Sequence, residues 1–554
     1  MTAETQEIPS QDAGAKRSAK RSVRTGKRYR TGRAAKHYDA IVIGSGIGGL
    51  CTAALLAKAG KKVCVLEQHY TAGGYTHSYE NAGYEWDVGV HYIGEVHKRW
   101  SILRRIFDVI SDGQIKWAAM NKCYDRIILG DETFNFVAGK DNFIAGLVQH
   151  FPEEETAIRD YVALLQAVSS KVPLFFAGQA LPFGIAKLYS KLRPRLFPAY
   201  FFQTTRAVLE TFTKNEKLIG VLTGQWGDYG LPPSESSFLM HAMVAKHYLA
   251  GAAYPVGGSW AIAEGIIPVI QAAGGEVFTY AGVEQVLVTA GRAVGVRLNN
   301  GDEILADQVV SNTGYWPTVN KLLPEAVKAK FAADKMTIPL SSAHLCLYAG
   351  FKGDAKTLGL DSTNLWIYPN ADHDSNVKKA KASNNNEFPL IYISFPSTKD
   401  PKWDENYPNK STVEIVTTGS LEQFMAWTGT QWSKRGDNYE AMKQEISERL
   451  LEILYKHRPQ LRDALDFSEL STPLSTQWFQ WNEVGEIYGL DHTPARFKQT
   501  KLHPQTPIKN LFLTGSDVVT AGVGGALMGG VMAATRMLGW RGYKIGRLLN
   551  ARPR

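Results

Sequence analysis

Residues 38–69, YDAIVIGSGIGGLCTAALLAKAGKKVCVLEQH, constrain the fold more than any other part of the chain. The apolar runs YDAIVI and KKVCVLEQ each predict a short strand, and GGLCTAALLAKAG between them predicts a helix that ends at Gly60. An acid, Glu67, lies at the end of the second strand. A G-x-G-x-x-G pattern in a β-α-β unit with an acid at this distance predicts a dinucleotide-binding domain.

Each residue of the pattern has a physical task. Gly44 permits the tight turn after the strand, Gly46 lets the backbone approach a pyrophosphate, and Gly49 lets the helix pack on the strand. The helix N-terminus stabilises the phosphate charge through its free N–H groups and its dipole. Glu67 can accept hydrogen bonds from both ribose hydroxyls, and its charge repels a 2′-phosphate, so the pattern disfavours NADP.

Two further glycine-rich stretches favour FAD over NAD. Gly73 and Gly74 follow the second strand, where the backbone can approach the dinucleotide a second time. Near the C-terminus, LTGSDVVTAGVGG predicts a strand, a turn and a helix, with Asp517 facing the ribitol and phosphates. The helix starts near Gly524 and directs its N–H groups at the flavin pyrimidine ring. The predicted cofactor-binding residues are Gly44, Gly46, Gly48, Gly49, Glu67, Gln68, Gly73, Gly74, Val283, Gly515, Asp517, Gly524 and Gly525.

The two ends of the chain therefore build one site, and the sequence predicts an α/β protein of two domains. Residues 274–314 predict a β-meander with turns at TAGRA and NNGD, and its last strand is ADQVVSNTG. The first domain is a Rossmann-like, glutathione-reductase-like FAD-binding domain, and the second is a discontinuous α+β substrate domain that faces a membrane. We expect the first from residues 37–100, 255–316 and 504–541, and the second from residues 101–254 and 317–503.

Residues 1–36 form a basic stretch that we expect to be a disordered tail. They include ten Lys or Arg, three acids and almost no apolar residues. Their excess of positive charge accounts for most of the net charge of +9. A solvated leader, attraction to anionic lipid headgroups and contact with nucleic acid are the three interpretations of this composition. The rest of the chain is nearly neutral, so no basic nucleic-acid-binding face is predicted there.

Several classes of site and location are disfavoured. The leader lacks the apolar segment of a secretory signal peptide, and no uninterrupted apolar stretch reaches the length of a membrane span. His241 and His247 are six positions apart rather than three or four, which argues against a metal pair. We expect a cytoplasmic, peripheral membrane protein with reduced thiols and no metal. The cysteines without metal-ligand spacing are Cys51, Cys64, Cys123 and Cys346.

These features resemble the phytoene desaturase superfamily of flavoproteins, and most of all its retinol saturase and carotenoid isomerase branch. The resemblance covers nearly everything after residue 38 and implies non-covalent FAD, a tunnel for a long apolar substrate, and association with a membrane. The chain has no second G-x-G-x-x-G unit, so the electron donor or acceptor stays open: a redox partner protein, a quinone, oxygen or a transiently bound nicotinamide. Besides the nucleotide motif, the resemblance rests on EWDVGVHYIGE (85–95), AYPVGGSWAIAEGIIPVIQAAGGEV (253–277), FPLIYISFPSTKDPKW (388–403), GEIYGLDHTPARF (485–497) and LTGSDVVTAGVGGALMGG (513–530).

Asp87 and His91, with Tyr92 beside them, are the candidate catalytic residues. On a strand, Asp87, Gly89 and His91 share one face, and Gly89 permits a ring or a substrate to approach closely. His91 can transfer a proton near neutral pH. The alternative is a hydrogen-bonded core histidine, with Asp87 in a structural hydrogen bond. A strong catalytic acid is not required, because the cofactor carries the hard step.

Other polar residues have less specific patterns. Glu264, in the helix after PVGGSW, fits a solvated or capping role better than a catalytic one. Tyr488, Asp491 and His492 fall in a predicted loop, where they either gate a substrate or hold the loop in place.

Residues 183–209, FGIAKLYSKLRPRLFPAYFFQTTRAVL, interleave basic residues with leucines and aromatics and contain no acid. This pattern is typical of a segment that anchors at a membrane interface. Pro194 and Pro198 predict that the segment is broken into short pieces. The alternative is a core-facing helical hairpin with a basic solvent face.

From these features we expect a flavoenzyme that reduces a C=C bond in a long apolar polyene, such as a retinoid, a carotenoid or an unsaturated lipid chain. A polyene desaturase or cis–trans isomerase is the second hypothesis, since a fold does not fix the direction of a reaction. A flavin-binding partner protein without turnover is the third.

Overall fold

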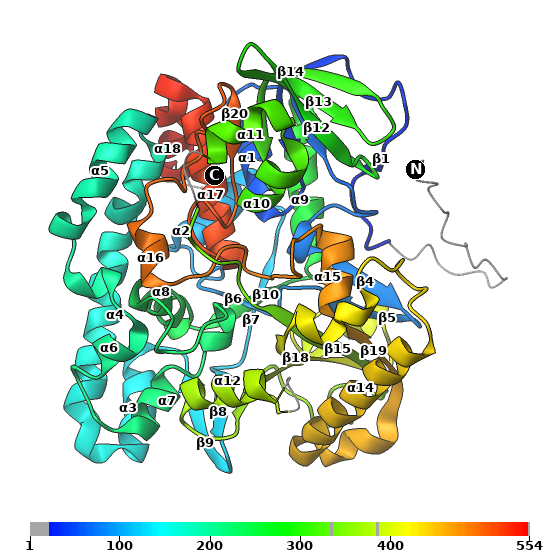
Figure 1. Cartoon of the computed structure of the whole chain (residues 1–554). Coiled ribbons are helices and arrows are strands. Elements are labelled where there is room, and N and C mark those ends of the chain that lie inside the picture. Colours follow the sequence, from blue (N-terminus) through cyan, green and yellow to red (C-terminus); the bar gives the residue numbers. More distant parts are fainter. Residues whose placement is uncertain (1–21, 333–335, 384–386, 552–554) are drawn as a thin grey trace.

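The computed structural model describes residues 22–332, 336–383 and 387–551, which form a mixed α/β structure around two large sheets (Figure 1). The strands of the first sheet are β1 (Lys27–Arg28), β2 (His37–Ile43), β3 (Val63–Leu66), β11 (Glu276–Thr279), β12 (Val283–Thr289), β13 (Arg292–Leu298), β14 (Glu303–Ser311) and β20 (Leu511–Leu513). Their order is β1-β11-β3-β2-β14-β13-β12, with β20 paired to β14. The carboxyl ends of the parallel strands β2, β3, β14 and β20 therefore meet at one edge.

The predicted β-α-β unit is present as β2, α1 (Ile47–Lys58) and β3. Helix α1 is buried almost throughout and lies against α9 (Trp260–Ala272) and α17 (Gly522–Met537). A Cβ atom on Gly530 of α17 would lie 2.7 Å from the Cβ atom of Cys51, so glycine is what lets α17 approach α1 this closely. The predicted β-meander is also confirmed, as the antiparallel strands β12, β13 and β14.

The second sheet comes from segments interleaved with the first. Its strands are β8 (Cys123–Leu129), β9 (Glu132–Val137), β15 (Ala343–Lys352), β16 (Asn364–Tyr368), β17 (Ile391–Ser394), β18 (Lys410–Gly419) and β19 (Leu465–Ser471), in the order β19-β15-β18-β17-β16-β8-β9. Two small sheets join the large ones: β6 (Ile93–Gly94), β10 (Ala252–Pro255) and β7 (Trp117–Ala119), and the pair β4 (Ser78–Asn81) and β5 (Tyr84–Asp87).

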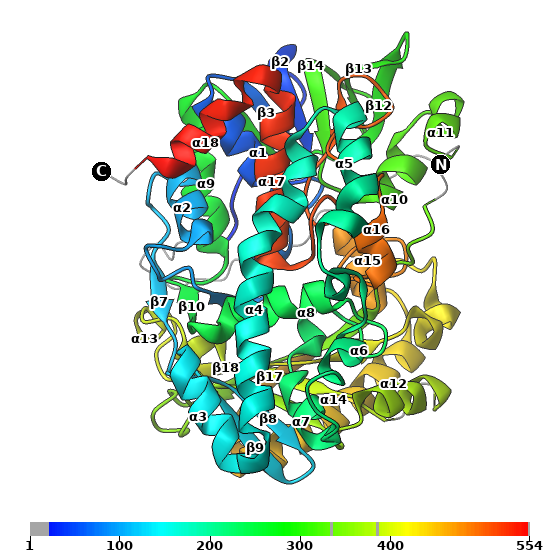
Figure 2. The same cartoon turned by 90° about the vertical axis from the view of Figure 1, so that its left-hand side faces the viewer.

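Helices cover both sheets and form one side of the molecule, which faces the viewer in Figure 2. That side carries α2, α4, α5 and α18 in particular. The remaining helices are α2 (Ile102–Ile110), α3 (Lys140–His150), α4 (Glu155–Phe176), α5 (Phe183–Leu196), α6 (Thr205–Leu209), α7 (Glu216–Leu222), α8 (Phe238–Leu249), α10 (Tyr315–Pro317), α11 (Glu325–Ala332), α12 (His373–Ala382), α13 (Trp403–Asn406), α14 (Asp437–His457), α15 (Pro473–Gln480), α16 (Pro494–Lys498) and α18 (Tyr543–Asn550).

The expectation of a disordered tail over residues 1–36 is wrong for residues 22–36. Thr25 donates its backbone N–H to Thr71 Oγ1 at 2.9 Å, and Tyr29 donates its hydroxyl to Asp302 at 2.8 Å. Strand β1 pairs in parallel with β11 at the edge of the first sheet. These partners lie far away in the chain, which is why local composition did not reveal them. Residues 1–21 lie outside the described residues.

Helix α2 packs in the same core as α1, although we expected residues 101–110 in the substrate domain. Leu103, Ile106 and Phe107 of α2 are buried among side chains of α1 and α9. We therefore propose that the boundary between the two domains lies after α2.

Among the described residues, one helical stretch is long and apolar enough to cross a membrane: residues 152–180, which include α4. Lys171 interrupts its apolar part, so this stretch is not an uninterrupted apolar run in the sequence. Of its most apolar window, 39% is buried inside the protein.

Candidate functional site

A cavity of about 980 Å³ runs from the carboxyl edge of the first sheet to the second sheet and the helical side. Gly46 and Glu67 line one end, and Met240, Tyr248 and Val416 line the other. Ligand pockets commonly measure ~300–1,000 Å³, so this cavity is large enough for a cofactor and part of a substrate. The segments at its ends come from both predicted domains.

The glycine loop after β2 forms a cradle that only glycine permits. Gly44 has φ +90°, and a Cβ atom on Gly49 would lie 2.3 Å from the carbonyl oxygen of Gly44. A Cβ atom on Gly74 would lie 2.8 Å from Cα of Gly46, so the second glycine stretch packs directly on the first. At this end of the cavity, two backbone stretches carry no side chains, which would let a pyrophosphate approach closely.

Glu67 is buried and tied to this loop. Its Oε2 accepts hydrogen bonds from the backbone N–H and the hydroxyl of Ser45 at 2.9 and 2.6 Å, and its Oε1 accepts one from the N–H of His69 at 2.9 Å. Each carboxylate oxygen can accept more than one hydrogen bond, so Glu67 retains capacity for a ribose hydroxyl.

Asn312, which sequence reasoning missed, lies between three glycines of the site. Added Cβ atoms on Gly46, Gly48 and Gly515 would each lie 2.6–2.8 Å from its side-chain amide. Asn312 follows β14 directly, and β14 ends at the same edge of the sheet as β2 and β3. That edge is where open α/β sheets bind ligands, so the position after β14 was the signal that could have found it.

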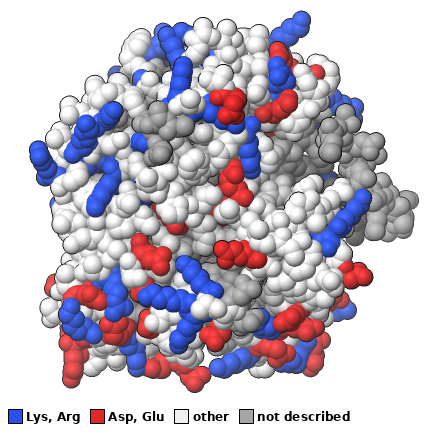
Figure 3. All heavy atoms as spheres, in the orientation of Figure 1, with Lys and Arg blue, Asp and Glu red and all other residues white. Residues whose placement is uncertain are grey.

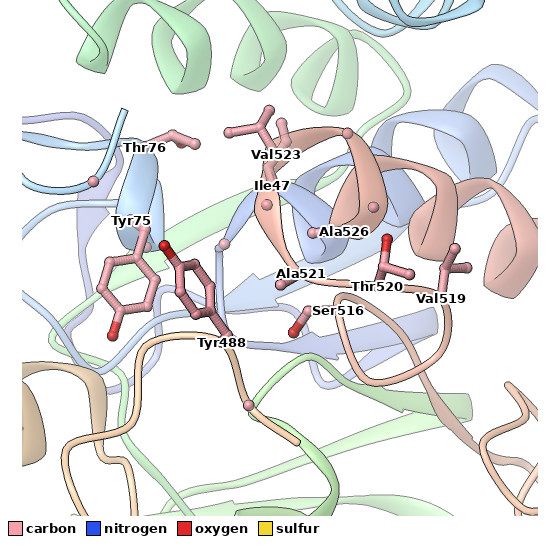
Figure 4. Close-up of a pocket in the computed structure, with 18 of the residues that line it drawn as sticks. Ile47, Tyr75, Thr76, Tyr488, Ser516, Val519, Thr520, Ala521, Val523 and Ala526 are labelled. Atoms are coloured by element: carbon pink, nitrogen blue, oxygen red, sulfur yellow. The ribbon is translucent and has the colours of Figure 1, made fainter. Parts of the chain in front are cut away.

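Asp517 organises the loops at the C-terminal side of the cavity. Its oxygens accept hydrogen bonds from the backbone N–H of Tyr315 at 2.7 Å and of Leu490 at 3.1 Å. Helix α17 begins just beyond, at Gly522, and Ala521 before it donates its N–H to His492 Nε2 at 2.8 Å. Figure 4 shows the start of α17 facing the part of the cavity where the rings of Tyr75 and Tyr488 lie beside each other.

Most of the predicted cofactor-binding residues line this cavity, and the others support its walls. Gly49 is a contact between helix and strand, Gly73 has φ +129° before the short turn at Gly74, and Gly515 has φ +85° beside Asn312. The residues that line the cavity are Gly44, Gly46, Gly48, Glu67, Gln68, Gly74, Val283, Asp517, Gly524 and Gly525.

The predicted alignment of Asp87 and His91 on one strand face is wrong, because β5 ends at Asp87. Asp87 is buried away from the cavity and accepts hydrogen bonds from Ser78 Oγ at 3.0 Å and Ser259 N–H at 2.9 Å, as well as one from the Tyr254 hydroxyl. Burial, with a contribution from nearby Glu414, raises its pKa to about 6. Asp87 therefore holds β5 to the segment before α9, as the structural alternative predicted.

Gly89 and His91 come after the strand, and both line the cavity. A Cβ atom on Gly89 would lie 3.0 Å from side-chain atoms of Tyr75, so the ring that approaches this glycine is Tyr75. His91 Nδ1 lies 2.6 Å from Oε2 of Glu414, which is fully buried on β18. Tyr92 also lines the cavity and donates its hydroxyl to Asp125 at 2.9 Å.

The pair of His91 and Glu414 holds one proton in a dry environment. Burial lowers the pKa of His91 to about 3 and raises the pKa of Glu414 to about 8, so both groups favour their neutral forms at pH 7. A protonated Glu414 donates its O–H to Nδ1, which places the ring proton on Nε2. Sequence reasoning missed Glu414, which lies in an unremarkable strand pattern far from His91.

Lys399, also missed, fixes the backbone of His91. Its Nζ donates to the carbonyl oxygen of His91 at 3.0 Å, to Asn364 Oδ1 at 2.6 Å and to Ser394 Oγ at 2.7 Å. Burial lowers the pKa of Lys399 to about 8, while Glu414 and two buried aspartates oppose this shift. Lys399 does not line the cavity, so it positions His91 rather than touching a ligand.

Two of the three loop candidates, Tyr488 and His492, hold the loop in place, and Tyr488 also lines the cavity. Tyr488 lines it and donates its hydroxyl to the carbonyl oxygen of Gly227 at 2.8 Å. His492 is the acceptor for Ala521 before α17, and Asp491 is half-buried and does not line the cavity. Glu264 lies on α9 and does not line the cavity.

His241 and His247 are structural, and no group of metal-ligating residues occurs in the part of the chain that the structure describes. His241 is hydrogen-bonded to the hydroxyls of Tyr161 at 2.8 Å and Tyr229 at 3.1 Å. His247 Nε2 accepts the N–H of Gly94 at 2.8 Å. All four cysteines are free thiols, and Cys51 and Cys64 are buried core residues as expected.

Residues 183–209 form a longer first helix than expected, because Pro194 lies in the last turn of α5 and does not end it. Arg193 does not belong to the exposed basic face that the pattern predicted. It is buried, donates to the carbonyl oxygen of Gln499 at 2.8 Å and lies over the ring of Phe175. The exposed apolar residues of α5 are Ile185, Leu188, Leu192 and Leu196, and its exposed basic residues are Lys187, Lys191 and Arg195.

Comparisons with known proteins agree with this geometry. Residues 42–107 match the family of NAD(P)-binding Rossmann-like domains. The chain is 37% identical to all-trans-retinol 13,14-reductase of Rattus norvegicus, over 92% of this chain and 87% of that protein. It is 32% identical to inactive all-trans-retinol 13,14-reductase of Danio rerio, over 92% of this chain and 87% of that protein. Chloroplastic prolycopene isomerase of Arabidopsis thaliana is 26% identical, over 90% of this chain and 82% of that protein.

Solved structures show the same architecture at low identity. An oxidoreductase from Methanosarcina mazei superposes with a TM-score of 0.59 at 18% identity, over 89% of this chain and 98% of that chain. At this identity the likeness shows the fold alone. Together with the matched Rossmann-like domain, it confirms the predicted fold class.

Proposed function

The chain belongs to the all-trans-retinol 13,14-reductase family, and from this premise we propose that it is a flavin-dependent oxidoreductase that reduces a C=C bond of a retinoid. The observation that carries the proposal is the position of His91. One cavity joins the glycine cradle to a largely apolar chamber, and the His91–Glu414 pair lies on the wall of that chamber. A long polyene in the chamber would thus share the cavity with a dinucleotide and have a proton donor beside it.

The cofactor we propose is non-covalent FAD. Glu67 would accept hydrogen bonds from the ribose, and the bare backbone at Gly46 and Gly74 would lie against the pyrophosphate. The start of α17, with Gly524 and Gly525 in its first turn, would direct N–H groups at the flavin ring. Bound reduced flavin supplies a hydride to one carbon of a double bond.

The chain's own residues would supply the proton and exclude water. His91 would donate the Nε2 proton to the second carbon, and Glu414 would pass its proton to Nδ1 so that the ring does not carry an unpaired charge. Lys399 would hold the backbone of His91 in place during the transfer. Rings of Tyr92 and Tyr248, stacked at 4.3 Å, would shield this part of the chamber from solvent.

The second hypothesis, isomerisation or desaturation of a polyene, uses the same cavity and cofactor. Its support is the likeness to prolycopene isomerase at 26% identity. Because one relative is named as inactive, a flavin-binding protein without turnover stays the third hypothesis. Reduction is the primary proposal because the relatives at 36–37% identity are named as reductases. We also propose that a separate redox partner or a transiently bound nicotinamide supplies electrons, as the sequence has no second dinucleotide motif.

We further propose that the helical side of Figure 2 docks on an anionic membrane surface. Most of the exposed large apolar side chains lie on its elements: Trp100, Ile102, Leu174, Ile185, Leu188, Leu192, Leu196, Trp540 and Tyr543. Over α5, Figure 3 shows Lys and Arg side chains without acids among them. Trp100 and Ile102 are exposed and also line the cavity, so the cavity reaches the surface on this side. A lipid-soluble substrate could then enter directly from the bilayer.

The reaction can be assigned with the flavin-loaded enzyme after anaerobic photoreduction. Adding all-trans-retinol should reoxidise the flavin and give a product two hydrogens heavier. A changed isomer without reoxidation would favour the isomerase, and bleaching of oxidised enzyme by a saturated substrate would favour the desaturase. A flavin spectrum that no polyene alters would support the non-catalytic hypothesis.

A further inference from the structure

Five acidic residues line the cavity, and Asp228 differs from the other four in its contacts. Among the described residues, the Asp228 carboxyl makes no hydrogen bond or ion pair, and its Oδ2 is buried without a partner. The other four are satisfied: Glu67 by Ser45, Glu95 by Lys246, Glu486 by the N–H of Val484, and Asp517 by the N–H groups of Tyr315 and Leu490. A buried polar group without a partner is rare in proteins and calls for a ligand or another physical reason.

Asp228 lies on the cavity wall in a turn that a hydrogen bond holds in place. It ends a short 3₁₀ turn, Trp226–Asp228, whose Gly227 carbonyl accepts the hydroxyl of Tyr488 at 2.8 Å. The chamber walls nearby are apolar or aromatic. They include Met240, Met243, Val244 and Tyr248. The cavity wall that includes Asp228 therefore also offers apolar surface on which an alkyl or polyene chain fits.

The carboxyl of Asp228 also acts electrostatically on two tyrosines near the proposed proton donor. After burial, the charge of Asp228 is the largest cause of the raised pKa of Tyr248. The ring of Tyr248 is stacked on Tyr92 at 4.3 Å, and Tyr92 follows His91 in the chain. Tyr392 is a second tyrosine that lies near His91 and that Asp228 affects. Its ring lies 5.1 Å from the ring of His91. Its pKa is raised by burial, then by Asp125 and then by Asp228.

We propose that Asp228 binds the terminal hydroxyl of a long polyene alcohol and thereby selects both the alcohol and the double bond that is reduced. The proposal rests on the function proposed above and identifies a specificity-determining residue for it. Burial raises the pKa of Asp228 well above its ordinary value, which favours the neutral carboxylic acid. Such a group offers one O–H donor and one carbonyl acceptor, which match the acceptor and donor of an alcohol. A hydrocarbon would leave both unpaired.

The position of Asp228 has a consequence for the site of reduction. In this proposal, a hydroxyl held at Asp228 would place the carbons next to it toward the Tyr92–Tyr248 stack and His91. The double bond nearest the alcohol is then the one that receives the proton. Without this anchor, the polyene can slide along the apolar chamber, and other double bonds reach His91.

Binding to the oxidised, flavin-loaded enzyme tests the proposal without turnover. The probes are all-trans-retinol and its deoxy hydrocarbon analogue, which has the same conjugated chain with a methyl group in place of the CH₂OH group. Quenching of protein fluorescence gives a dissociation constant for each. We expect wild type to prefer the alcohol by about tenfold, as one or two neutral hydrogen bonds predict. In Asp228→Leu this preference should fall to about one, with hydrocarbon affinity unchanged, and Asp228→Asn should retain part of it.

Asp491→Leu is the matched control. Asp491 is half-buried, its Oδ1 is buried without a partner and burial raises its pKa to about 7, but it does not line the cavity. This variant should keep the full preference for the alcohol. An equal preference in wild type and Asp228→Leu would overturn the proposal and leave water as the partner of Asp228. An equal loss in Asp491→Leu would also overturn it, because a general structural effect would then explain both.

Products of the reduced enzyme separate this inference from the proposed function. Wild type should saturate the double bond nearest the alcohol, whereas Asp228→Leu should give a mixture of positional isomers by mass spectrometry. If wild type reduces no polyene at all, the proposed function fails, while the binding measurement still decides the role of Asp228. One positional isomer from both enzymes would contradict the anchoring role.

Discussion

Nδ1 of His91 lies 2.6 Å from a carboxylate oxygen of Glu414, a residue 323 positions later in the chain. His91 follows the hairpin β4–β5, and Glu414 lies in the middle of β18 in the second sheet. The pair therefore exists only where the two halves of the fold meet. Its proton is held in a buried site on the cavity wall, so the pH dependence of reduction should report on it directly.

Replacing Glu414 by Gln should abolish the fall in kcat/KM that we expect for the wild type at alkaline pH. Burial raises the pKa of Glu414 to about 8, so the pair holds its extra proton below that pH and loses it above. The value of kcat/KM for reduction should thus fall as pH rises through about 8. The amide of Gln can donate to Nδ1 at every pH but cannot pass on a proton, so the decline should vanish and the rate should drop by about 100-fold.

Glu85→Gln is the control for this experiment. Burial raises the pKa of Glu85 to about 8 as well, but its partner is the Tyr407 hydroxyl and it does not line the cavity. This variant should keep the alkaline decline. A decline that survives in Glu414→Gln, or that disappears in Glu85→Gln, would show that another group sets it.

Replacing Lys399 by Met should move the same decline to higher pH. The charge of Lys399 lowers the pKa of Glu414, so its removal makes the Glu414 proton harder to lose. The rate should also fall, because the carbonyl of His91 loses its donor, while flavin content stays unchanged. Lys321→Met, which removes a lysine bonded to the carbonyl of Trp481, should leave the pH profile in place. A Lys399→Met profile that matches wild type would refute the positioning role.

Replacing Glu67 by Ala should weaken retention of the flavin. The variant loses a charged acceptor for the ribose, and a hydrogen bond to a charged group corresponds to about 1.5–3 kcal/mol of binding free energy. It also frees the loop at Ser45 that Glu67 fixes. Equilibrium dialysis or flavin fluorescence measures the change. Glu276→Ala removes an acid that bonds Tyr38 and Lys27 outside the cavity, and it should retain flavin as wild type does.

Reversing the charge of Lys187, Lys191 and Arg195 together should reduce binding to anionic vesicles. These residues are exposed on α5 beside the apolar stripe, and each contributes to attraction only while salt is low. Co-sedimentation with phosphatidylserine vesicles at low salt measures the effect. Reversal of Lys356, Lys402 and Lys456, exposed on other elements, is the control. If wild type does not sediment with anionic vesicles at low salt, the membrane proposal fails.

Features encoded in short stretches could be predicted from the sequence, and contacts across the fold could not. The glycine pattern, Glu67 and the strand–turn–helix near Gly524 are local, so their spacing was enough. Glu414 and Lys399 gain their roles from a strand pairing and a turn hundreds of residues from His91. The burial of Arg193 has the same cause, because its acceptor is the carbonyl of Gln499. Strand β1 was missed because its stability comes from β11.

A single turnover in deuterated water tests the central claim most directly. Wild-type enzyme is loaded with flavin, photoreduced without oxygen and mixed with all-trans-retinol while flavin absorbance is followed. We predict that the flavin reoxidises once per substrate, that the product is a dihydro compound with solvent deuterium on both carbons, because the transferable hydrogen of reduced flavin also exchanges with solvent, and that Glu414→Gln slows this step. Reoxidation without a reduced product, or a polyene recovered only as another isomer, would contradict the assignment as a C=C reductase.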